Sequence, residues 1–194
     1  RSKAVINETF PEGLPNSILC SDRLAAQLST ISKGTQICLA HLLRDLNYLS
    51  SAEQTFWASD FKTLLKDAIA LKQRQSAYSK SDTKALEIQQ RLDKLLDEKL
   101  LDELLKNQVK YKQTITFFRG MTKLRYALFP FLYDKRIPFD NNSSERAIRM
   151  IKVKLKVSGQ FKSLHQEFAI IRSVIGKAIK NNQSVFHAIK AVVN

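Results

Sequence analysis

Short apolar runs alternate with helical patterns over the first fifty residues. Apolar residues cluster at 17–20 and at 36–40, and each run is short enough for a buried strand. A helical pattern follows each run, at 23–29 and at 41–49, and a loop is expected at 33–34. Strand and helix in alternation are typical of a parallel α/β sheet. The pattern therefore predicts a small parallel β element near the N-terminus.

The alternation stops near residue 50, and the segment 52–135 shows only the period of amphipathic helices. We expect its three apolar stripes to form the core of a helical bundle, with a partner-binding coiled coil as the alternative. The stripes are Phe61, Leu64, Leu65 and Ala68; Ile88, Leu92, Leu95, Leu96 and Leu100; and Phe117, Met121, Leu124 and Leu128. The predicted fold is mainly α with a small parallel β element.

The stretch 138–149 combines a turn with the start of a helix. Asn141 and Asn142 suit a turn, and Asn142 followed three residues later by Glu145 matches an N-cap with its capping-box partner. Two interpretations of Glu145 follow. It either only caps the helix, or it is a metal ligand beside a basic helix face that carries Arg149, Lys152 and Lys156.

Between 150 and 157 a strand-like alternation competes with the helical period. We predict a helix, because the cap at Asn142 starts one and no breaking residue appears before Ser158 and Gly159. Further helices are expected after Gly159 and over 185–193.

The charge of the chain concerns its partners rather than its fold. A formal net charge of +14 over 194 residues favours nucleic acid or an anionic membrane surface. No run of roughly 18 apolar residues is present, so no membrane-spanning segment is expected. The two cysteines do not make a disulfide framework, which indicates a reducing, cytoplasmic compartment. The chain begins at Arg1 without Met, which suggests a fragment.

Several side chains are candidates for chemistry. Asp22 follows the first strand, where sites form in parallel sheets, but it could equally cap the next helix. Cys38 and His41 have the spacing of a zinc half-site without a second pair, so a structural role is favoured over metal binding. A nucleophile–base pair is the remaining alternative for these two residues.

Two carboxylates, Asp22 and Glu145, could hold divalent metal together if the fold brings them close. Asp45 and Asp140 are spare candidates, the first expected on an exposed helix face and the second in a turn. Basic residues around Glu145 could neutralise backbone phosphates without reading base sequence. Those assigned to DNA binding are Arg146, Arg149, Lys152, Lys156 and Lys162.

Taken in order, these motifs resemble the bacterial insertion-sequence transposases of the sixty-six type. Residues 140–149 read DNNSSERAIR and are very similar to the DNNxxERxxR signature of that family. Residues 36–44 resemble its C-x-x-H segment, Ser21-Asp22 resembles its second catalytic Asp, and 157–163 resemble a downstream segment.

The resemblance implies a DDE transposase with a ribonuclease-H-like core. The core would comprise 1–51 and 136–194, interrupted by an all-helical insertion over 52–135. Asp22 and Glu145 would be two of three carboxylates holding two Mg²⁺ or Mn²⁺ ions, with Cys38, His41 and Asn142 supporting them. The expected partners are transposon-end and target DNA and further copies of the chain, in the cytoplasm at the nucleoid.

The resemblance leaves the first catalytic Asp without a counterpart, because that residue lies on a strand upstream of everything in this chain. We therefore expect a partial core that does not cut or join DNA alone. One alternative is a non-catalytic, basic helical protein that binds nucleic acid. Another is a helical scaffold whose partner binds through 83–106.

Overall fold

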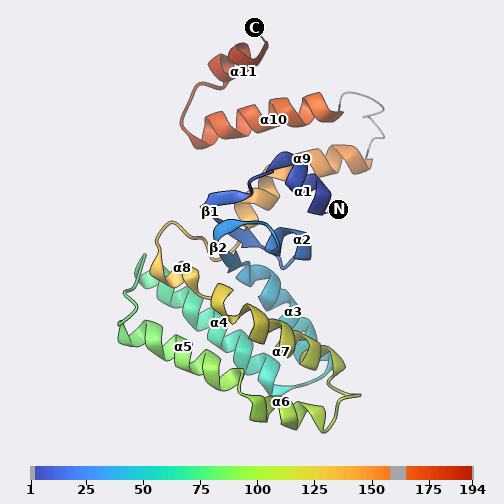
Figure 1. The fold of residues 1–194 in the computed structure, drawn as a ribbon, viewed down its shortest axis with the longest axis vertical. Coiled ribbons are helices and arrows are strands. Elements are labelled where there is room, and N and C mark those ends of the chain that lie inside the picture. The colour runs from blue at the N-terminus through green and yellow to red at the C-terminus, as the bar shows by residue number, and fades with distance from the viewer. Residues whose placement is uncertain (1–2, 158–164, 194) are drawn as a thin grey trace. The chain divides into compact units, whose positions relative to one another are not determined.

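The computed structural model describes residues 3–157 and 165–193. The chain forms two compact units, Arg1–Asn141 and Asn142–Asn194 (Figure 1). The first unit contains a two-stranded parallel sheet and a set of helices, and within the described residues the second contains helices alone. The prediction of a mainly α fold with a small parallel β element is confirmed.

The sheet of the first unit is built from β1 (Leu14–Ser21) and β2 (Ser32–Ile37). The helix α1 (Lys3–Thr9) precedes the strands, and α2 (Ala25–Leu28) connects them. The strands are parallel, with Cys20 opposite Gln36 and Ser21 opposite Ile37. Their carboxyl ends therefore lie at the same edge, where the chain turns into α2 and α3.

The second strand occupies a different segment from the one predicted. Residues 33–34 lie inside β2 rather than in a loop, and the run 36–40 passes into a helix after Ile37. A Cβ at Gly34 would lie 3.3 Å from Ile18 Cδ1, so glycine suits the close approach of the two strands. β1 is also longer than the predicted 17–20, because Leu14 already pairs with Ser32.

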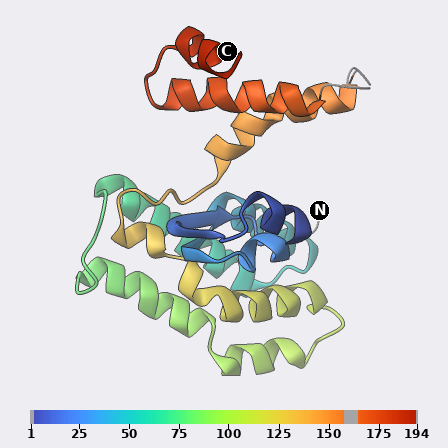
Figure 2. The same cartoon turned by 45° about the horizontal axis from the view of Figure 1, so that its top comes forward.

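Helices fill the rest of the first unit, as predicted for 52–135. They are α3 (Leu39–Ala52), α4 (Phe56–Arg74), α5 (Thr83–Leu95), α6 (Glu98–Leu105), α7 (Lys112–Leu124), the 3₁₀ turn η1 (Arg125–Ala127) and α8 (Pro130–Tyr133). Both views place α5 and α6 at the edge of this unit farthest from the strands (Figure 2).

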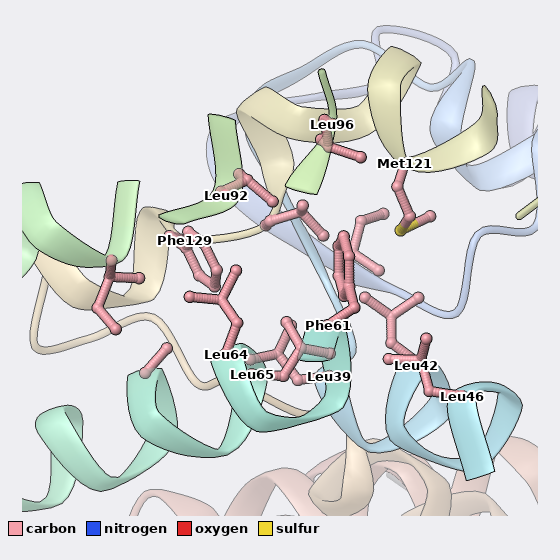
Figure 3. Packing of buried hydrophobic residues seen from close by; sticks show 14 of the residues in the cluster. Leu39, Leu42, Leu46, Phe61, Leu64, Leu65, Leu92, Leu96, Met121 and Phe129 are labelled. Atoms are coloured by element: carbon pink, nitrogen blue, oxygen red, sulfur yellow. The ribbon is translucent and has the colours of Figure 1, made fainter. Parts of the chain in front are cut away.

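The predicted apolar stripes form the core of this helical part. Figure 3 shows side chains of α3, α4 and α7 pointing toward one another, among them Leu42, Phe61 and Met121, all fully buried. Leu100 departs from the prediction and is 37% exposed. The helix that was expected to carry it ends earlier, because the Asp97 carboxylate accepts the Lys99 N–H at 2.8 Å and caps a new helix, α6.

The second unit contains α9 (Asn142–Val157), α10 (His165–Lys180) and α11 (Val185–Val193). The helix predicted over 150–157 is therefore confirmed, and α9 begins within one residue of the predicted cap. Asn182 takes a φ of 52° after the end of α10, a conformation that asparagine tolerates better than most residues. In the part of the chain that is described, no helix is both long and apolar enough to cross a membrane.

Candidate active site

The turn after β1 carries Asp22, whose side chain is exposed. Asp22 does not cap α2, contrary to one of its two interpretations, because the N-cap position is Leu24 and no side chain caps it. The intervening Arg23 has a φ of 73°, which reverses the chain before the helix starts. No hydrogen bond or ion pair joins the Asp22 carboxylate to another described residue.

Neighbouring side chains hold this turn in place. The buried Ser21 Oγ donates to Gln27 Oε1 at 2.8 Å and accepts the Arg23 N–H at 3.2 Å. The Arg23 guanidinium is paired with Asp45 of α3 and lies 5.1 Å from the ring centroid of Phe117 in α7. Positive φ at a non-glycine residue costs free energy and persists where surrounding contacts determine it. The turn that presents Asp22 is thus fixed by α2, α3 and α7.

Asp45 lies on α3, and its side chain is 41% exposed. Its ion pair with Arg23 was not predicted from the sequence. Ser21, Arg23 and Gln27 were not identified as supports of the turn. The positive φ of Arg23 has no sequence signal, because that conformation is normally marked by glycine or asparagine.

Residues 139–141, which are distant in sequence but belong to the same unit, contact the start of α3. The Leu39 N–H donates to the Phe139 carbonyl at 2.8 Å, and the Asn141 N–H points at Cys38 Sγ at 3.4 Å. Cys38 Sγ also lies 3.2 Å from His41 Nδ1. Cys38 and Leu39 therefore contact residues that lead into Glu145, and the structural role of Cys38 and His41 stays a prediction.

The thiol of Cys20 lies in the same neighbourhood. Burial, with smaller contributions from Cys38 and Asp140, raises the pKa of Cys20 from 9.0 to about 12. A thiol with so high a pKa stays protonated near neutral pH, and protonated thiols are poor nucleophiles and metal ligands.

In the second unit, Glu145 occupies the first turn of α9 and is partly exposed. Arg146, Arg149 and Lys152 are exposed on α9. Lys156 belongs to α9, whereas Lys162 lies outside the described residues.

Residues 1–167 match the transposase IS66 family. The chain belongs to this family. No curated protein and no solved structure gives a significant match. Membership implies a transposase that acts on DNA, and DDE transposases in general use divalent metal ions.

This IS66-family chain supplies some of the oxygen donors that such a metal ion needs, but not a complete set among its described residues. Asp22 and Glu145 supply carboxylate oxygens, which Mg²⁺ and Mn²⁺ prefer. Asp22 is exposed at the carboxyl end of a parallel strand, where a ligand has access. Among the described residues, no three His, Cys, Asp or Glu side chains are grouped as a metal site.

Proposed function

We propose that this chain forms part of the catalytic domain of a transposase that cleaves and joins DNA strands at transposon ends. Asp22 and Glu145 would be two of the three carboxylates that hold the metal ions. The match to the transposase family over 1–167 carries the proposal. The exposed Asp22, held on a fixed turn at a strand end with no partner among the described residues, supports it.

The proposed reaction is in-line attack on a phosphodiester, first by water and then by the freed 3′-hydroxyl. Bound Mg²⁺ or Mn²⁺ would stabilise the charge that develops on the attacking and leaving oxygens. Arg149 and Lys152 are exposed on α9 and would contact backbone phosphates. His41 and Cys38 would act indirectly, by fixing the chain at Phe139 and Asn141.

The test is strand transfer by the full-length protein carrying Glu145→Ala or Asp22→Ala. Each variant should abolish joined product yet leave binding to transposon-end DNA largely unchanged. Glu167→Ala is the matched control for Glu145, because Glu167 also lies in the first turn of a helix of the same unit. The exposed Asp60 on α4 provides the control for Asp22.

Retained strand transfer in either site variant would refute the assignment of that carboxylate. Equal loss of strand transfer and of end binding would instead indicate a structural role. No residue of this chain is assigned as the third carboxylate, so residues 1–194 alone should give no joined product with Mg²⁺ or Mn²⁺. Joined product from this chain alone would contradict that expectation.

A further inference from the structure

A pocket of about 750 Å³ opens beside the turn that carries Asp22. Its walls come from the turn itself, from α3 and from the first part of α7, so it lies wholly within the first unit. Arg23, the residue after Asp22, is one of the lining residues. The volume falls within the range of pockets that take small ligands or single groups of larger ones.

The charges around this pocket are unbalanced. Three cationic side chains, Arg23, Arg44 and Lys112, line it together with one carboxylate, Asp45. Asp45 is already engaged by Arg23. Arg44 and Lys112 are exposed and form no ion pair with any residue that the structure describes. Two uncompensated cations at one opening favour an anionic occupant.

Two aromatic rings complete the walls. Phe117 is buried, and the Arg23 guanidinium already lies over its ring. Tyr48 is 57% exposed at the pocket and thus offers a ring to an incoming group. An exposed aromatic ring beside two cations suits a nucleotide, because the base can stack on the ring while its phosphates approach the cations. A base inside a duplex already stacks on its neighbours, so an unpaired nucleotide fits this surface better.

We propose that the pocket formed by Arg44, Tyr48 and Lys112 binds an unpaired nucleotide of a DNA strand. The base stacks on Tyr48, and the flanking phosphates contact Arg44 and Lys112. The inference rests on the proposed function, because that function supplies DNA as the occupant. It adds a binding site for an unwound strand next to Asp22, and it involves none of the residues assigned to the metal or to phosphate contacts on α9.

The test is fluorescence anisotropy with a labelled single-stranded oligonucleotide, in EDTA so that no metal contributes. Tyr48→Ala should weaken binding about tenfold, which lies within the range for losing one stacked base. Tyr126→Ala is the matched control, because Tyr126 is 65% exposed and does not line this pocket. A duplex of the same sequence should bind Tyr48→Ala and the unsubstituted chain equally.

The salt dependence of binding tests the cationic part. Lys112→Ala should lower the slope of log affinity against log salt concentration by about 0.7, the value for one contact to single-stranded DNA. Lys99→Ala is the control, because Lys99 is an exposed lysine at the start of α6. Unchanged fluorescence of Trp57, which packs in the core of this unit, would verify that each variant folds.

Equal effects of Tyr48→Ala and Tyr126→Ala, or of Lys112→Ala and Lys99→Ala, would overturn the site. Displacement by a free mononucleotide as effective as displacement by the oligonucleotide would overturn the assignment to a DNA strand. These outcomes are separate from the test of chemistry. A full-length protein that binds single-stranded DNA through Tyr48 yet joins no DNA would refute only the proposed function. Strand joining that depends on Glu145, with no effect of Tyr48→Ala on binding, would refute only the nucleotide site in the pocket.

Discussion

Glu53 joins two helices of the first unit, and its removal should destabilise that unit strongly. It follows α3 directly and is 7% exposed. Its two carboxylate oxygens accept the backbone N–H groups of Gln113 and Thr114, each at 2.9 Å. Those N–H groups belong to the first turn of α7, where no preceding carbonyl is available to them. A distant side chain thus caps α7.

The magnitude follows from the two hydrogen bonds. Glu53→Gln keeps the shape and one acceptor oxygen but turns an NH₂ group toward the second N–H. One N–H group is then left without an acceptor, at a cost of about 1–3 kcal/mol. Glu53→Ala leaves both N–H groups without an acceptor and should lower the free energy of unfolding by roughly 2–5 kcal/mol. We also predict the order of stability: the wild type is the most stable, Glu53→Gln is intermediate and Glu53→Ala is the least stable.

Urea unfolding followed by tryptophan fluorescence measures this effect. Trp57 is the single tryptophan of the sequence, and its ring centroid lies 5.4 Å from that of Phe118 in α7, so its emission reports on the first unit. Glu103→Gln is the control, because Glu103 is 65% exposed and pairs with Lys106 on the surface. Such pairs contribute about 0–1 kcal/mol. Equal unfolding free energies for Glu53→Gln and Glu103→Gln would refute the capping argument.

Two further predictions concern the sheet. Gln36 is fully buried, donates to the Leu128 carbonyl at 3.0 Å and accepts the Phe131 N–H at 3.0 Å. Gln36→Leu leaves both of these backbone groups without a partner, so it should lower the free energy of unfolding by about 2–4 kcal/mol in the same urea assay. The pKa of Cys20 is raised from 9.0 to about 12 in the folded chain, so less of its thiol is ionised at pH 8. Alkylation of Cys20 at pH 8 should therefore be about 1,000-fold slower in the folded chain than in the urea-unfolded chain, and mass spectrometry measures both rates. The folded state also retains this proton after the unfolded chain has lost it, so stability should fall as pH rises from about 9 toward 12. Equal alkylation rates in folded and unfolded chains would contradict the raised pKa.

The helices were predictable because their signal is local. Leu42, Leu46 and Leu49 repeat with the helical period, and all three are buried in α3. The cap of α5 is equally local, because the Asp82 carboxylate accepts the N–H groups of Lys84 and Ala85. In each case the residues that determine the element lie within a few positions of one another, so no tertiary information is needed.

The strands and the supports of the candidate site depend on distant contacts. β2 includes Lys33 and Gly34, which look like a loop until Ile18 of the neighbouring strand is placed beside them. The caps and pairs of the first unit join Glu53 to Gln113, 60 positions away, and Arg23 to Asp45, 22 positions away. Such pairs leave no periodic pattern, and many other acidic residues could have filled either role.

The C-x-x-H pair and the asparagine-rich turn are parts of one contact, although 103 positions separate Cys38 from Asn141. Cys38 Sγ lies between His41 Nδ1 and the Asn141 N–H, and the next residue, Leu39, binds the Phe139 carbonyl. A sulfur placed this way is occupied by neighbours from its own chain. Cys38 is also fully buried, which argues against both a zinc half-site and a nucleophile at this residue. The contacts of Cys38 and Leu39 thus hold the chain at Asn141 and Phe139, and a small, weakly polar sulfur suits the space between an imidazole and a backbone N–H.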